Sequence, residues 1–208
     1  NIKVFNSPKK IKNFQDFDIV VLAVTPQNAE IALKDYKLFT FKKNCVLISI
    51  MAGKKIIFLK KLLPSMKQVI RVMPNMPALI GQGVSCLVCS KFVSQNNKNK
   101  ATKLFDKVGT SIWLSKEKEI DIATAISGSG PGYVFLIIDA MEKAANKLGL
   151  NKRLNKKIIS QTFLGSIKLL DYTKKEASEL ADTIAIKGGT TEAEIKANRP
   201  SFWKRIFG

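Results

Sequence analysis

The stretch FDIVVLAVTP, residues 17–26, decides the fold class of this 208-residue chain. Its middle, Ile19 to Val24, is an almost unbroken apolar run, which is typical of a parallel strand buried on both faces of a sheet. Pro26 then suits the first position of a helix, which we expect to reach Tyr36. A buried strand that leads directly into a helix is the repeating unit of a parallel α/β sheet.

Strand and helix patterns continue to alternate up to about residue 115. Strands are predicted at residues 45–51, 68–73, 84–88 and 111–114, and helices at residues 55–63 and 95–108. The alternation indicates a parallel sheet with right-handed crossovers. Ligands of such sheets bind beyond the carboxyl ends of the strands, so a site is expected near the loops at residues 24–27, 51–53 and 73–77.

The rest of the chain has the apolar spacing of helices only. Helices are predicted at residues 117–126, 131–148, 152–172 and 176–184, with one more after Thr191. The excess of positive charge is concentrated before residue 116, and this change in composition predicts a domain boundary there. We therefore expect a sheet-containing domain at residues 1–115 and an all-helical domain at residues 116–208.

Composition excludes several kinds of chemistry. The chain has no histidine, which rules out a histidine general base, a Ser-His-Asp triad and every histidine-containing metal site. Its three cysteines, with no secretory leader visible, indicate reduced thiols and a cytoplasmic protein. Cys86 and Cys89 lie in an apolar run, which favours a structural strand over a redox or metal site.

The net charge of +19 allows two interpretations. A basic face could bind nucleic acid or a membrane surface. Only four of the 35 basic residues are arginines, however, and arginine is the residue that specific phosphate and base contacts prefer. A lysine-rich background is therefore favoured. No uninterrupted apolar run approaches the length of a membrane span.

Three loops carry the candidate chemistry. Pro74 and Pro77 fix the backbone around Asn75, and this pattern suits a rigid shelf beside a ligand and an ordinary strand-exit turn equally well. Residues 127–131, SGSGP, predict a helix start with free N–H groups, where the alternative is an elbow between helices. Residues 187–192, KGGTTE, predict a second helix start that suits a carboxylate, where the alternative is a glycine turn with a threonine cap.

Together these motifs resemble the pyrroline-5-carboxylate reductase family. The matching stretches are DIVVLAVTPQ (18–27), IRVMPNMPALIGQG (70–83), TAISGSGPGYVFLIIDAM (124–141), QTFLGSIKLL (161–170) and KGGTTEAEI (187–195). The resemblance implies an α/β fold, with part of a Rossmann-type parallel sheet followed by an all-helical dimerisation domain. It also implies reduction of 1-pyrroline-5-carboxylate to L-proline with NADPH or NADH, in a homodimer or a higher homo-oligomer, with no metal, nucleic-acid or membrane partner.

The resemblance also assigns residues to roles. The nicotinamide half of the cofactor would lie near Val24, Thr25, Pro26, Ala52, Pro74 and Asn75. The substrate carboxylate would be held by Gly188, Gly189, Thr190 and Thr191, and the far wall of the site would be formed by Ser127, Ser129 and their neighbours, partly across the dimer interface. Thr191 would also reach the ring nitrogen of the substrate, which makes it the candidate catalytic residue.

The sequence departs from the family pattern in four places. No strand with a Gly-rich loop stands before residue 17, Thr25 replaces a usual lysine, and Ile186-Lys187 replaces a common Ser-Pro. The tail after Ile195 does not follow the pattern. We therefore expect a chain clipped at both ends that binds NADPH poorly. An inactive oligomerising fragment, a nucleic-acid binder and a dehydrogenase for another small acid are the alternatives to a reductase.

Overall fold

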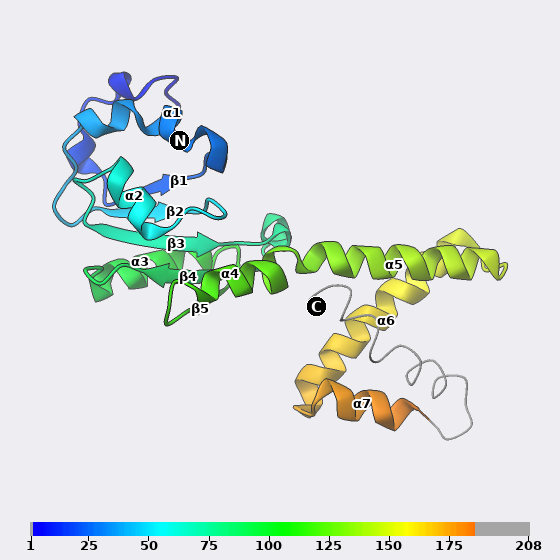
Figure 1. Ribbon diagram of the computed structural model, residues 1–208. Coiled ribbons are helices and arrows are strands. Elements are labelled where there is room, and N and C mark those ends of the chain that lie inside the picture. The colour runs from blue at the N-terminus through cyan, green and yellow to red at the C-terminus, as the bar shows by residue number, and fades with distance from the viewer. Residues whose placement is uncertain (1, 186–208) are drawn as a thin grey trace. The chain divides into compact units, whose positions relative to one another are not determined.

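Five strands form one sheet in the order in which they occur along the chain (Figure 1). They are β1 (Ile19–Leu22), β2 (Val46–Ser49), β3 (Gln68–Met73), β4 (Gly83–Cys89) and β5 (Gly109–Trp113). In this computed structural model the described residues are 2–185, and they divide into two units, residues 2–135 and residues 136–185. All five predicted strands are confirmed.

One pair of strands does not run as predicted. β1, β2 and β3 are parallel to one another and β4 is parallel to β5, but β3 and β4 are antiparallel. The prediction of an all-parallel sheet is therefore wrong for this pair. The physical reason is the connection at residues 74–82, which is shorter than the roughly dozen residues that a crossover between parallel strands needs.

Helices cover both faces of the sheet in the first unit (Figure 1). They are α1 (Ala29–Leu33), α2 (Ile56–Leu62) and α3 (Gln95–Phe105), with short 3₁₀ turns at Pro8–Lys10, Phe14–Asp16, Pro26–Asn28, Asp35–Leu38 and Met76–Ile80. Alternate residues of β2 face opposite ways: Leu47 packs with Leu33 and Leu59, and Val46 packs with Phe105. The single helix predicted from Pro26 to Tyr36 is divided between α1 and its flanking 3₁₀ turns.

Two glycines bring β4 and β5 together at their first residues. Gly83 and Gly109 are paired in register, and a Cβ atom on Gly109 would lie 1.9 Å from the carbonyl oxygen of Gly83. Gly109 also has a φ of +144°, a conformation that L side chains rarely adopt. The close approach of these two backbones therefore requires glycine at residue 109.

The three cysteines are free thiols with different exposure. Burial raises the pKa of the Cys45 and Cys86 thiols, whereas Cys89 is half-buried. Cys86 and Cys89 pair with Met73 and Ile70 respectively, and because they are three residues apart in β4 their side chains lie on opposite faces of the sheet. This geometry agrees with the prediction that the pair is structural.

The exposure of the thiols predicts how they react with a disulfide reagent such as Ellman's reagent. Only the thiolate reacts, so Cys89 should be modified first in the folded protein, and Cys45 and Cys86 only on unfolding. The measurement is the number of thiols released with time, with and without denaturant. Replacing Cys89 with serine should remove the fast phase, and a fast phase that survives this substitution would contradict the assignment.

The helices that follow β5 along the chain begin in the first unit. They are α4 (Glu119–Ala123), a π-helical turn (Thr124–Gly128), α5 (Gly130–Lys147), α6 (Lys152–Thr173) and α7 (Ala177–Ile184). The division between the units falls inside α5, because α4 packs against β3 and β4 and so belongs with the sheet. Within the helical unit, the Asn155 side chain of α6 donates to the carbonyl oxygen of Glu142 at 2.8 Å and to Asn146 at 3.1 Å, and so fixes α6 against α5.

The predicted break in the helix at residues 127–130 is wrong. Glu119 to Lys147 form one continuous helix, and SGSGP lies within it. The N–H of Ser129 bonds to the carbonyl oxygen of Thr124 at 3.0 Å, five residues earlier, so the backbone stays hydrogen-bonded through this segment. The small residues allow a π-helical turn here where their sequence alone suggests a break.

Candidate active site

Six of the predicted site residues lie at one edge of the sheet. In register, Leu22 at the end of β1 lies beside Ser49 at the end of β2, which lies beside Arg71 in β3. The loops that follow these parallel strands therefore share the carboxyl edge of the sheet. They carry the residues predicted to bind the cofactor: Val24, Thr25, Pro26, Ala52, Pro74 and Asn75. Thr25 and Ala52 are exposed, and the other four are half-buried.

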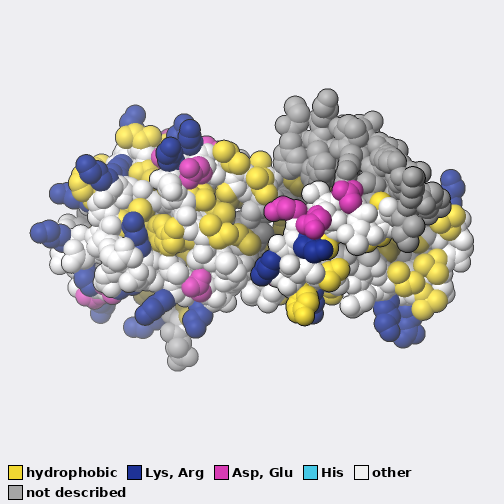
Figure 2. All heavy atoms as spheres, turned by 90° about the horizontal axis from the view of Figure 1, so that it is seen from below, with side chains coloured by type: hydrophobic (Ala, Val, Ile, Leu, Met, Phe, Trp, Pro, Cys, Tyr) yellow, Lys and Arg dark blue, Asp and Glu magenta, His cyan; other side chains and the backbone are white. Residues whose placement is uncertain are grey.

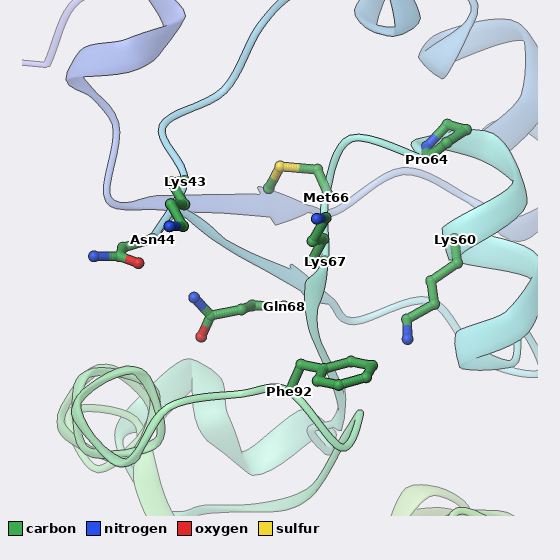
Figure 3. Close-up of a pocket in the computed structure, with 8 residues that line it drawn as sticks. All are labelled: Lys43, Asn44, Lys60, Pro64, Met66, Lys67, Gln68 and Phe92. Carbon is green, nitrogen blue, oxygen red and sulfur yellow. The ribbon is translucent and has the colours of Figure 1, made fainter.

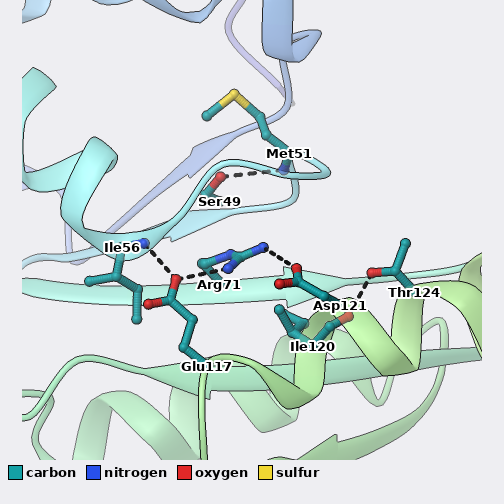
Figure 4. Close-up of polar contacts among 8 residues, drawn as sticks. All are labelled: Ser49, Met51, Ile56, Arg71, Glu117, Ile120, Asp121 and Thr124. Carbon is teal, nitrogen blue, oxygen red and sulfur yellow. Dashed lines mark hydrogen bonds and ion pairs between the residues drawn. The ribbon is translucent and has the colours of Figure 1, made fainter.

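The turn after β2 is held by a buried hydroxyl. Ser49 is fully buried, and its Oγ accepts a hydrogen bond from the backbone N–H of Met51 at 3.3 Å (Figure 4). This bond shapes the turn immediately before Ala52. The position of Ala52 at the edge is thus determined by a side chain inside the sheet.

Asn75 connects two segments that are far apart in the sequence. Its Oδ1 accepts the backbone N–H of Val84 at 2.8 Å, and its Nδ2 donates to the carbonyl oxygen of Ser127 at 3.2 Å. The side chain therefore holds the loop between β3 and β4 and joins it to the π-helical turn. The structure thus shows this amide fixing the loop, and its role in binding the cofactor stays a prediction.

The bond from Asn75 to Ser127 compensates for a proline. In a regular helix the carbonyl of Ser127 would accept the N–H of residue 131, but Pro131 has no N–H. Asn75 supplies the missing donor. The carbonyl oxygen of Ser127 is therefore hydrogen-bonded, although the helix continues through a proline.

The structure corrects the role predicted for residues 127–131. The backbone N–H groups of Ser129, Gly132 and Tyr133 bond to carbonyl oxygens within the helix, so this segment does not present the free N–H groups of a helix start. A cradle of backbone amides for an anion is therefore absent from residues 127–131. What the segment offers is the Ser127 hydroxyl, which is buried and has no hydrogen-bond partner in residues 2–185.

A mainly apolar pocket of about 360 Å³ lies beside this hydroxyl. Its polar side chains are Asn75 and Ser127, and the rest of the lining is Pro77, Val84, Ile126, Gly130, Pro131, Val134 and Phe135. Ser129 is exposed and does not line it. An apolar pocket with a few fixed polar groups is the usual form of a site for a small organic molecule.

An ion pair that the sequence analysis missed fixes α4 against the sheet (Figure 4). The Arg71 guanidinium donates to Oε1 of Glu117 at 2.8 Å and lies 3.6 Å from Asp121 of α4. The same Glu117 oxygen accepts the N–H of Ile56, the first residue of α2, at 2.7 Å. The Arg71 side chain is only 4% exposed. A lone arginine in the apolar strand QVIRVM was the available signal for a buried partner.

The remaining predicted residues lie outside the described part of the chain. They are Gly188, Gly189, Thr190 and Thr191, the loop predicted to hold the substrate carboxylate. Their roles stay predictions, as does their convergence with residues 127–131.

Replacing Asn75 with leucine should destabilise the first unit by about 1–3 kcal/mol, because it leaves the half-buried N–H of Val84 and the carbonyl of Ser127 without partners. The measurement is the free energy of unfolding in urea. Asn28, which is exposed and makes no side-chain cap, provides the matched control, Asn28→Leu. Equal losses in the two variants would contradict the connecting role of Asn75.

Comparison with known proteins decides the family. The pyrroline-5-carboxylate reductase of Haemophilus influenzae is 35% identical to this chain over 196 residues, which cover 94% of the chain and 72% of that protein. The chain belongs to the pyrroline-5-carboxylate reductase family. The family profile described as pyrroline-5-carboxylate reductase dimerisation matches residues 117–202. The enzyme of Pseudomonas aeruginosa is 39% identical, over 88% of this chain and 66% of that protein.

Solved structures of the pyrroline-5-carboxylate reductase family confirm the fold class. The chain is similar to a pyrroline carboxylate reductase of Plasmodium falciparum with NADP bound, with a TM-score of 0.84 and 34% identity over 91% of this chain and 71% of that one. It is also similar to the Coxiella burnetii enzyme, with a TM-score of 0.82 and 32% identity over 93% of this chain and 72% of that one. The resemblance drawn from the motifs is thus confirmed.

Proposed function

We propose that the protein is an NAD(P)H-dependent oxidoreductase that reduces 1-pyrroline-5-carboxylate to L-proline, the last step of proline biosynthesis. The observation that carries this proposal is the similarity to enzymes named pyrroline-5-carboxylate reductase at 35% and 39% identity, which extends over both the sheet and the helices. This extent also makes a purely oligomerising role the less well supported alternative.

The carboxyl edge of the sheet suits a nicotinamide cofactor. The exposed Thr25 and Ala52 leave the edge accessible, and Pro74 and Pro77 restrict the backbone of the neighbouring loop. Beside that loop lies the buried Ser127 hydroxyl, which lacks a partner in the described residues and is available to a bound molecule. The similar Plasmodium falciparum structure contains NADP, which supports the same cofactor class here.

The chemistry required of the protein is modest. When bound, the reduced nicotinamide supplies a hydride to the C=N carbon of the substrate. The loops of the carboxyl edge would hold and orient the two reactants, the apolar pocket would exclude water, and the Thr191 hydroxyl would bond to the ring nitrogen. Because the imine can arrive protonated, no histidine acid is needed, in keeping with a chain that has none.

The helical unit supports a homodimer or a higher homo-oligomer. In its described part, residues 136–185, only Asn155 and Ile159 are buried. Its exposed apolar side chains include Leu136, Leu154, Ile158, Leu164, Ile167 and Leu169. By length and composition alone the helix Glu119–Lys147 could cross a membrane, but the dimerisation profile covers it, and a second copy accounts for its exposed face.

On the face that Figure 2 shows, the distribution of charge does not point to a nucleic-acid interface. Figure 2 shows lysine and arginine side chains scattered over the visible face, rather than gathered into one continuous basic patch. With free thiols and relatives that are biosynthetic enzymes, we place the protein in the cytoplasm. The proposed partners are therefore the small substrate, the cofactor and a second copy of the chain.

The assay of NADPH and NADH oxidation with pyrroline-5-carboxylate tests the proposal directly. We expect the cofactor to be oxidised only when the substrate is present, with one L-proline formed for each cofactor oxidised. A chain that forms dimers but shows no turnover at saturating NADPH and NADH would instead be the inactive oligomerising fragment.

The exposed apolar side chains of α6 lead to a prediction about dimerisation. Replacing Ile158 and Leu169 of α6 together with glutamate should give a monomer, because these two exposed side chains lie on the same side of the helix and the change puts two charges on an apolar face that a partner would bury. Light scattering after gel filtration measures the mass. Lys157→Glu, an exposed change on the same helix, should leave the dimer intact. A double variant that remains dimeric would show that this face is not the interface.

A further inference from the structure

A second pocket lies at the edge of the sheet opposite the carboxyl edge (Figure 3). The proposed reaction involves none of its residues. It has a volume of about 620 Å³ and is formed at the amino ends of β2 and β3 and beyond the carboxyl end of the antiparallel β4. Its polar lining consists of three lysines, Lys43, Lys60 and Lys67, and two amides, Asn44 and Gln68. No aspartate or glutamate lines it.

Gln68 gives this pocket a fixed hydrogen-bond donor. The residue is 8% exposed, and it is one of the residues that line the pocket (Figure 3). Its Oε1 accepts the backbone N–H of Ser94 and the Nδ2 of Asn97, both at 2.9 Å. These two donors determine which end of the amide is oxygen, so the nitrogen is the end left for the pocket. Within residues 2–185 this Nε2 donates no hydrogen bond.

The network behind Gln68 makes the donor rigid. Asn97, which is itself buried, also donates to the carbonyl oxygen of Asn44 at 2.9 Å. The amide of Gln68 is thereby held between α3 and the start of β2 before any ligand arrives. A donor that is ordered in advance loses little entropy when an acceptor binds.

The other walls suit a molecule that is both anionic and flat. Three ammonium groups around one cavity repel one another unless an anion lies between them. Phe92 is 68% exposed, and the Lys60 ammonium lies 5.5 Å from the centre of its ring. Lysines bind phosphate groups as point charges, and an exposed aromatic ring stacks on a nucleobase.

We propose that this pocket is a binding site for a nucleoside phosphate, separate from the cofactor edge. The phosphates would lie among Lys43, Lys60 and Lys67, the base would stack on Phe92, and Gln68 Nε2 would donate to an oxygen of the ligand. The volume falls within the range of small-molecule sites.

Calorimetric titration of the whole protein with ATP, at saturating NADPH to fill the cofactor edge, tests the proposal. We expect ATP to bind under these conditions, more tightly than inorganic tripolyphosphate, which lacks the ring. Gln68→Glu should weaken ATP binding by about tenfold or more, because it replaces the donor with a negative charge. That variant keeps the acceptor for Ser94 and Asn97, and an unchanged thermal unfolding midpoint would show that it folds.

A charge-matched pair separates the pocket from general attraction to a basic protein. Lys60→Gln with Lys67→Gln should lower ATP affinity well beyond Lys34→Gln with Lys37→Gln, which removes two exposed lysines outside the pocket. Equal losses in the two pairs would overturn the proposal. Tripolyphosphate binding as tight as that of ATP would refute the assignment to nucleotides.

Discussion

Replacing Arg71 with alanine is expected to lower the free energy of unfolding by about 2–4 kcal/mol, because it removes a charge-assisted hydrogen bond to Glu117 and the packing of a buried side chain. Glu117 would keep only the N–H of Ile56, and Asp121 would lose its nearest positive charge. The same change leaves a void beside β3, where the Arg71 side chain is only 4% exposed. The loss should therefore exceed that of any surface substitution in this chain.

Urea unfolding of a small set of variants gives the measurement. Arg153→Ala, an exposed change in the first turn of α6, is the matched control and should cost less than about 0.5 kcal/mol. Combining Arg71→Met with Glu117→Gln removes both charges and should be less damaging than the sum of the single changes. A loss in Arg71→Ala no greater than that of the control would show that the ion pair does not stabilise the fold.

Loss of the Arg71 ion pair should also affect the candidate active site, because α4 leads directly into the π-helical turn. The Thr124 hydroxyl that begins this turn bonds to the carbonyl oxygen of Ile120 at 2.6 Å (Figure 4). Ile120 is the buried residue of α4, so a loosened α4 would displace Ser127 and the apolar pocket. Arg71→Ala should accordingly reduce turnover even at temperatures where the variant is folded.

The sequence predicted the strands because they are short, apolar and bounded by turn residues. It also predicted the carboxyl edge, since the order of strands and helices alone brings the loops at Thr25, Ala52 and Asn75 together. It did not predict that β4 reverses, although the nine positions numbered 74–82 between the strands contained the necessary information. Connection length, rather than composition, was the signal to use there.

The error at SGSGP has a different physical origin. Glycine, serine and proline are weak helix formers, so local propensity indicates a break. In the folded chain the missing proline donor is replaced by Asn75, a side chain from a loop far away in the sequence. The Arg71–Glu117 pair is of the same kind, since residue 71 shows that a partner is needed but not which carboxylate provides it. Long-range contacts of this type cannot be derived from local patterns.

Replacing Thr191 with alanine is expected to lower kcat/KM by about 100-fold, the usual cost of removing one positioned hydrogen-bond donor from a reacting centre. This prediction rests on the proposed function and on the role that the family resemblance gives to this hydroxyl. The alanine variant keeps the backbone of the loop but loses the hydroxyl that would bond to the ring nitrogen. Steady-state kinetics with pyrroline-5-carboxylate measures the change.

The pattern of the loss distinguishes a catalytic hydroxyl from a structural one. Thr191→Ser retains a hydroxyl and should recover most of the activity, and the unfolding midpoint and NADPH affinity of Thr191→Ala should stay near those of the unmodified chain. Thr190→Ala, a change in the neighbouring threonine of the proposed carboxylate loop, should act mainly on KM, since it would weaken the grip on the substrate without touching the ring nitrogen. Because the chain has no histidine that could take over this role, near-normal turnover in Thr191→Ala would mean that Thr191 has no part in the reaction.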